Sequence, residues 1–139
     1  MTVGMPDNGR RFAPVRTKYL ACLYGNVYVT INQVQILEYL DAAGDSPYRD
    51  WFESLNAQAA AKVTVAGTRI ELGNLSNVKG VGAGVQEFRI DFGPGYRVYF
   101  GRDGDRLLIL LAGGTKSRQQ KDIAAAQKRW ADYKKRKKG

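Results

Sequence analysis

The chain has 139 residues, of which 22 are Lys or Arg and 13 are Asp or Glu, giving a formal net charge of +9. This length fits a single domain. One cysteine, Cys22, and no histidine exclude a disulfide framework and a Cys/His zinc site, and any acid–base chemistry has to use Asp, Glu, Tyr, Lys or Arg.

Residues 1–31 show no sustained periodicity apart from a short apolar patch at 19–24. We expect them to form an N-terminal extension, in part disordered, that precedes one domain over residues 32–139. The extension lacks the apolar core of a signal peptide. The chain also contains no run of about 18 apolar residues, so we expect no membrane span.

The first regular elements are predicted after this extension. Alternation of apolar and polar residues predicts a strand over 33–40. Ser46 followed by Pro47 is typical of a helix start, and Asn56 can cap a second helix over 57–72. That second helix has apolar residues at helical spacing: Ala59, Val63, Ala66 and Ile70.

Three strands are predicted in the second half of the chain. The Gly-rich residues 78–84 form a loop that precedes a strand, so they are not a dinucleotide-binding fingerprint. Residues 85–92 and 96–102 alternate between the two faces of a sheet, and each run ends in a turn that contains glycine. Residues 106–112 are nearly all apolar, which indicates a central strand covered on both faces. Two glycines at 113–114 are expected to end it.

A last helix, which we expect Ser117 to cap, carries most of the charge. Residues 116–139 hold ten basic and two acidic residues, and therefore eight of the nine net positive charges. A solvated helix end explains the lysines and arginine at 134–138, whereas the whole basic helix is equally well explained by a polyanionic or acidic partner. The element order β-α-α-β-β-β-α predicts a small α+β domain, with an antiparallel sheet and the helices packed on one face.

Residues 84–100 (GVQEFRIDFGPGYRVYF) and 107–126 (LLILLAGGTKSRQQKDIAAA) closely resemble the HigB-like addiction-module killer proteins of the RelE/ParE toxin superfamily. The resemblance extends over about residues 33–137. It implies a RelE-like fold, a helix-turn-helix antitoxin as partner, and toxicity in the cytoplasm. One branch of the superfamily cleaves mRNA in the ribosomal A site, and another inhibits DNA gyrase without cleaving anything.

The resemblance and the missing histidine together favour metal-independent mRNA cleavage on the ribosome, without a cofactor. Such cleavage needs an activated ribose 2′-hydroxyl, a stabilised phosphate charge and a protonated leaving oxygen. RelE-like enzymes use Lys, Arg and Tyr for these tasks. Arg97, in a Gly-Tyr-Arg motif, matches a recurrent superfamily position, and strand alternation places Arg89 and Tyr99 on the same face. A cross-strand ion pair with Glu87 or Asp91 explains Arg97 equally well.

Lys116 comes at the start of the last helix, where an anion site can form, although a plain strand-to-helix turn also accounts for it. The predicted catalytic residues are Arg89, Arg97, Tyr99 and Lys116, and the predicted RNA-binding residues are Lys79, Arg118 and Lys121. RelE-like nucleases carry a tyrosine on the last helix, where this chain has Ile123. A toxin that acts on gyrase, or an inactive member that only binds its antitoxin, therefore remains an alternative.

Overall fold

The computed structural model describes residues 12–16, 34–105 and 107–138. Cys22 and most of the expected N-terminal extension lie outside these residues. In chain order the described elements are β1 (Phe12–Arg16), β2 (Gln35–Tyr39), α1 (Pro47–Glu53), α2 (Ala57–Glu71), β3 (Val78–Gly80), β4 (Val85–Ile90), β5 (Tyr96–Asp103), β6 (Leu107–Thr115), the 3₁₀ turn η1 (Lys116–Arg118) and α3 (Gln119–Lys138). The predicted α+β class is confirmed.

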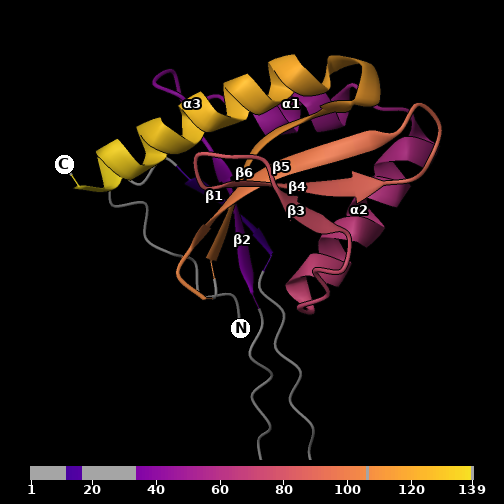
Figure 1. Cartoon of the computed structure of the whole chain (residues 1–139), viewed down its shortest axis with the longest axis horizontal. Helices are drawn as coiled ribbons and strands as arrows, with labels where there is room; N and C mark the ends of the chain where they lie inside the picture. Colours follow the sequence, from indigo (N-terminus) through magenta and orange to yellow (C-terminus); the bar gives the residue numbers. More distant parts are fainter. Residues whose placement is uncertain (1–11, 17–33, 106, 139) are drawn as a thin grey trace, which may run out of the picture.

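The described strands form one sheet in the order β1-β2-β6-β5-β4-β3 (Figure 1). The expected antiparallel meander is confirmed as β4, β5 and β6. One pair is parallel: β2 lies beside β6, with Gln35 opposite Leu107 and Glu38 opposite Leu110. The sheet is therefore mostly antiparallel, and β6 is central, as its apolar sequence predicted.

Local sequence signals account for α1 and α2. The Ser46 hydroxyl accepts a hydrogen bond from the backbone N–H of Arg49, and Pro47 follows at the first helical position. The Asn56 side chain likewise accepts from the N–H of Ala59. Both predicted caps are confirmed, and the four predicted apolar residues of α2 are all buried against the sheet.

The expectation that all helices pack on one face is wrong. Helices α1 and α2 cover one face of the sheet, whereas α3 crosses the other (Figure 1). The buried side chains of α3, Ala126, Trp130 and Tyr133, pack with strand residues of that second face, including Val85, Tyr99, Ile109 and Leu111. Because β6 is apolar on both faces, the second face also has to be covered. Gly101 makes room for this packing, since a Cβ there would lie 2.3 Å from Cε3 of Trp130.

Several boundaries also differ from the prediction. A short strand, β3, occupies the first part of the expected Gly-rich loop, and β1 lies within the expected N-terminal extension, paired with β2. Strand β6 continues through both glycines to Thr115. Ser117 is not the cap of the last helix: it lies inside η1, which leads into α3.

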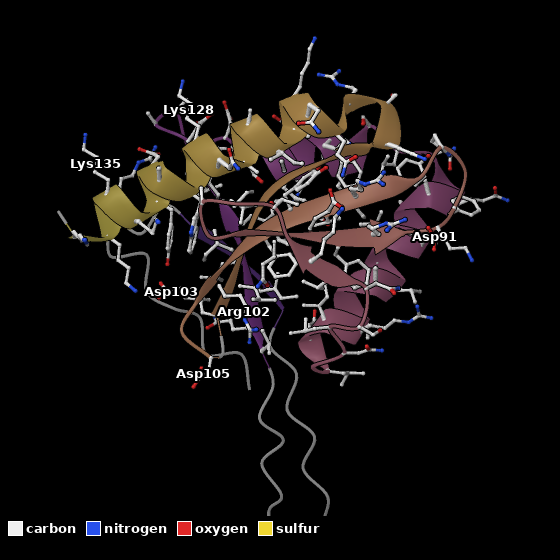
Figure 2. All side chains as sticks on the ribbon, viewed as in Figure 1. Asp91, Arg102, Asp103, Asp105, Lys128 and Lys135 are labelled. Carbon is white, nitrogen blue, oxygen red and sulfur yellow. The ribbon has the colours of Figure 1, made fainter. Side chains whose placement is uncertain are left out.

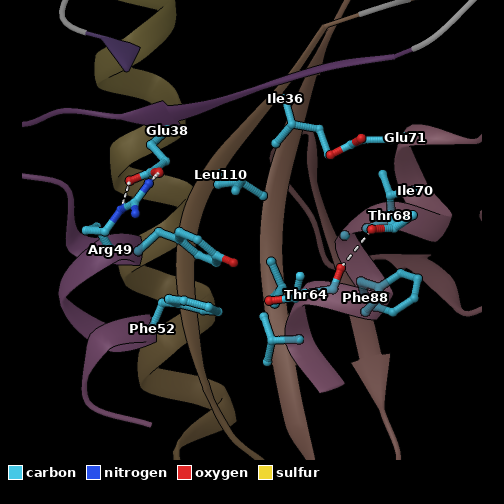
Figure 3. A pocket seen from close by; sticks show the side chains of 15 residues that line it. Ile36, Glu38, Arg49, Phe52, Thr64, Thr68, Ile70, Glu71, Phe88 and Leu110 are labelled. Carbon is cyan, nitrogen blue, oxygen red and sulfur yellow. Dashed lines mark hydrogen bonds and ion pairs between the residues drawn. The ribbon is translucent and has the colours of Figure 1, made fainter. Parts of the chain in front are cut away.

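A cavity of about 170 Å³ lies between α1, α2 and the sheet (Figure 3). Its walls are mostly apolar, and Glu38 at one end is buried. The Glu38 carboxylate accepts hydrogen bonds from the Ser46 hydroxyl and from the Arg49 guanidinium. The charge in this cavity is therefore already neutralised from within the fold. None of the described helices is both long and apolar enough to span a membrane.

Candidate nucleic-acid interface

Several buried polar side chains lie together near the start of α3, on the face of the sheet that α3 covers. The register places Glu87 opposite Tyr99, and Arg89 opposite Arg97, across β4 and β5. Glu87 and Tyr99 are completely buried, and Arg97 is only 6% exposed. The predicted common face of Arg89, Arg97 and Tyr99 therefore exists, but α3 and its neighbours cover two of the three side chains.

Glu87 is the centre of this group. Its Oε2 accepts a hydrogen bond of 2.9 Å from Nε2 of Gln119 in α3. Its Oε1 lies 3.5 Å from Nε of Arg97 and 3.7 Å from Nζ of Lys79. The cross-strand ion pair considered for Arg97 is thus present, and it is made with Glu87. Two cations from different strands share one buried carboxylate, so removing that carboxylate leaves Arg97 buried without compensation.

Tyr99 lies beneath the same carboxylate. Burial of the phenol and the nearby charge of Glu87 raise the pKa of Tyr99 above its ordinary value, so its hydroxyl stays protonated at every physiological pH. Within the described residues the hydroxyl makes no hydrogen bond of good geometry. Tyr99 can pack against Glu87 and hold its carboxylate in place, but the Tyr99 hydroxyl is not exposed at the surface.

The other predicted cations are on the surface. Arg89 and Lys79 line a small hollow along β3 and β4, which Asp91 also lines. Lys116 and Arg118 are exposed in η1. Lys116 and Arg97 both have atoms near Gly95: a Cβ on that glycine would lie 3.6 Å from Cβ of Lys116 and 3.8 Å from Nη1 of Arg97.

Lys121 belongs to a different surface, the solvent side of α3. Exposed cations follow this side at positions 121, 128, 135 and 138, and Figure 2 shows Lys128 and Lys135 directed away from the sheet. The two acids of α3 turn inwards. Asp132 bonds Tyr39 and pairs with Arg136, and Asp122 packs against Gly114. The charged residues named on the outer side of α3 are therefore all basic.

Sequence reasoning missed two residues of this region, Gln119 and Asp122. Gln119 is the hydrogen-bond donor that α3 places over Glu87. The carboxylate of Asp122 lies so close to the backbone that a Cβ on Gly114 would be 1.8 Å from its Oδ2. The Gly-Gly pair before the helix was the available signal, since glycine in a strand often marks a close approach. No group of three or more acidic or Cys side chains within the described residues could hold a metal ion.

Comparisons with known proteins bear on the resemblance. Residues 50–131 match the family described as phage derived protein Gp49-like (DUF891). An uncharacterized protein of Haemophilus influenzae is 43% identical over 81 residues, which are 58% of this chain and 82% of that protein. The Gp49-like family lies within the RelE/HigB-type toxin group, and its members have an antitoxin partner. Because the match covers more than half of the chain, this protein belongs to the Gp49-like family of toxin–antitoxin toxins.

Proposed function

We propose that this toxin is HigB-like and acts as a ribosome-dependent, metal-independent mRNA endonuclease that stops translation in the cytoplasm. The observation that supports the proposal is the convergence of cations around the start of α3. Four predicted site residues there are exposed Lys or Arg side chains: Lys79, Arg89, Lys116 and Arg118. Their charges lie on a domain whose residues 32–115 are slightly acidic. Phosphate groups are the natural ligands of such a cluster.

The proposed chemistry uses three cationic side chains, those of Arg89, Arg97 and Lys116. The ribose 2′-hydroxyl gives its proton to water as its oxygen attacks the adjacent phosphorus. The bond from phosphorus to the 5′-oxygen breaks, and the 5′-oxygen takes up a proton from the Lys116 ammonium, which water then reprotonates. Arg89 and Lys116 hold the phosphate as its negative charge grows. Arg97, whose guanidinium lies near Gly95, adds its positive charge from just beneath the surface, and the Lys116 ammonium is the proposed proton donor.

The remaining predicted residues have supporting roles in this proposal. Tyr99, buried against Glu87, fixes the carboxylate that orients Arg97. Lys79, Arg118 and Lys121 bind phosphates on either side of the cleaved bond. The antitoxin partner is a small helix-turn-helix protein, and a neighbouring reading frame that encodes one would support this pairing.

The test is induced expression followed by mapping of new mRNA 5′ ends. Wild type is expected to stop growth and to produce new ends inside translated messages. Arg89→Ala and Arg97→Ala are each expected to lower the frequency of these ends at least about tenfold, as loss of one transition-state contact does. Arg69→Ala is the matched control, because Arg69 is an exposed arginine on α2, on the opposite face of the sheet. Growth arrest with intact messages would refute the nuclease.

One observation favours a second candidate, a non-enzymatic ParE-like toxin that acts on DNA gyrase. Two of the four proposed catalytic side chains, Arg97 and Tyr99, are buried, and a binding toxin needs neither at the surface. That candidate predicts inhibition of gyrase supercoiling by the purified toxin, with no new RNA ends. A member that only binds its antitoxin predicts no growth defect at all.

A further inference from the structure

Helix α2 is apolar on two opposite sides. Its inner side is the buried stripe that packs on the sheet. Its opposite side repeats the same spacing of three and four residues, and we term it the outer seam of α2: Ala61, Val65, Thr68 and Leu72. Val65 is 50% exposed and Leu72 is 65% exposed, and these are the large hydrophobic side chains exposed in the part of the chain that the structure describes. A helix that is apolar on both sides is typically covered on both sides.

The threonine hydroxyls on this side of α2 are satisfied within the helix. The Thr68 hydroxyl donates a hydrogen bond of 3.1 Å to the carbonyl of Thr64, and the Thr64 hydroxyl donates one of 2.8 Å to the carbonyl of Ala60. Neither hydroxyl needs an outside partner, so the methyl groups are left for apolar contact. Both threonines also line the mostly apolar cavity of about 170 Å³ (Figure 3). The outer seam therefore runs beside a cavity that the fold leaves unfilled.

Two cations follow one edge of the outer seam. Lys62 and Arg69 are seven residues apart, and both are exposed. Nζ of Lys62 lies 5.5 Å from the centre of the Phe92 ring, and neither cation forms an ion pair with an acidic side chain among the described residues. Glu71, the one acid of α2, is buried. An apolar seam with a row of like charges along its edge is the pattern by which one helix selects another.

We propose that the outer seam of α2 docks an amphipathic helix of a partner protein, with apolar residues on the seam and acidic residues beside Lys62 and Arg69. A second copy of this chain is a poor fit, because two α2 helices packed antiparallel would set their rows of cations against each other. The antitoxin is the partner that the family supplies. The inference thus rests on the antitoxin pairing and not on the proposed nuclease activity.

Two synthetic peptides of three heptads serve as probes for the full-length toxin. Both carry Leu at the a and d positions, and they differ in having either Glu or Lys at the e and g positions. Wild type is expected to bind the acidic peptide at least about tenfold more tightly than the basic one, as measured by fluorescence anisotropy at physiological salt. Val65→Gln combined with Leu72→Gln is expected to weaken the acidic peptide at least about tenfold. Lys62→Glu combined with Arg69→Glu is expected to reverse the preference.

Helix α3 offers matched controls for both pairs of substitutions. Lys128→Glu combined with Lys135→Glu reverses two exposed cations at the same seven-residue spacing (Figure 2), and is expected to keep the preference for the acidic peptide. Ala131→Gln puts a polar side chain on an exposed apolar position of α3 and is expected to leave both affinities unchanged. Thermal unfolding of each variant verifies that it is folded.

Three results would overturn the proposal: equal affinities of wild type for the two peptides, an unreversed preference after the Lys62 and Arg69 changes, and full binding after the Val65 and Leu72 changes. Light scattering of wild type alone is expected to show a monomer. A dimer that the Val65 and Leu72 changes abolish would assign the seam to a second copy of the chain, against the proposal.

Mapping of RNA ends separates this inference from the proposed function. If wild type selects the acidic peptide but produces no new RNA ends, the docking surface stands and the nuclease fails. If wild type produces new ends but binds neither peptide, the nuclease stands and the docking surface fails.

Discussion

The two faces of the sheet differ in what their polar groups do. On the face covered by α1 and α2, the buried Glu38 is bonded by Ser46 and Arg49 from within the fold. On the face covered by α3, four titratable side chains near the start of that helix keep buried atoms without a hydrogen-bond partner among the described residues: Glu87, Arg97, Tyr99 and Asp122. Buried polar groups are normally satisfied. The two faces therefore differ in how closely their buried acid is bonded, since Glu87 faces Arg97 and Lys79 only at 3.5 and 3.7 Å, and we expect the first face to contribute more to stability.

The largest expected effect on stability comes from the α1/α2 face. Phe100 is completely buried in its core, so Phe100→Ala should lower the free energy of unfolding by about 3–5 kcal/mol. Urea denaturation measures the change. Lys116→Ala, an exposed change at the other face, should alter the same quantity by less than about 0.5 kcal/mol. Similar values for the two variants would contradict the division of roles.

A second substitution asks what the buried carboxylate contributes. Glu87→Gln removes the charge that faces Arg97 and Lys79, and should cost about 3 kcal/mol because Arg97 stays buried without an anion. The double variant Glu87→Gln with Arg97→Met should recover much of that loss, as measured by denaturation. If the double variant were no more stable than the single one, the two side chains would not act as a pair.

Two glycine-to-alanine substitutions should change stability by smaller amounts and in opposite directions. Gly113→Ala forces a Cβ into the indole of Trp51 and should destabilise by about 1–3 kcal/mol. Gly67→Ala in α2 meets nothing within 4 Å and should stabilise by about 0.5–1 kcal/mol, because alanine favours a helix. Melting temperatures of the two variants should therefore move in opposite directions. A shared direction would show that Trp51 is not held against the strand.

The smallest effects are in pH dependence. Lys137 and Tyr133 lower the pKa of Asp103 below 3.8, so its stabilisation is present above that pH and disappears as pH falls through the lowered value. Burial raises the pKa of Asp122, so its ionisation removes stability as pH rises. At pH 7, Asp103→Asn should therefore destabilise and Asp122→Asn should stabilise, each by less than about 1 kcal/mol. Midpoints of urea denaturation at pH 3 and pH 7 measure the stability change of each variant. If the two variants changed stability in the same direction at pH 7, the opposite pKa shifts of Asp103 and Asp122 would be refuted.

Features that depend on residues close together in the sequence could be predicted from the sequence. The caps Ser46 and Asn56 and the buried stripe of α2 follow from local hydrogen bonding and helical spacing. The central position of β6 followed from its apolar run. Strand β3 was missed because it is three residues long and contains glycine, and strands of that kind are held by their partner more than by their own sequence.

The sequence could predict which residues share the face of the candidate site, but not which of their side chains are exposed. Alternation placed Arg89, Arg97 and Tyr99 on one face correctly. It could not show that α3 covers Tyr99, because the position of a helix over a sheet depends on contacts far apart in the chain, such as Trp130 on Gly101. The apolar residues Ile109 and Leu111 on the same face already required such a cover, and this requirement was the signal that sequence reasoning left unused.

The parallel pairing of β2 with β6 has a consequence for synthesis of the protein. The centre of the sheet joins residues 35–38 to residues 107–110, so β2 has no inner neighbour until β6 has been made. Non-local pairings of this kind form late and slowly. The nascent toxin therefore stays without its complete sheet, and without the surface at the start of α3, through most of its translation. Any activity that depends on this surface can begin only after nearly the whole chain has been made.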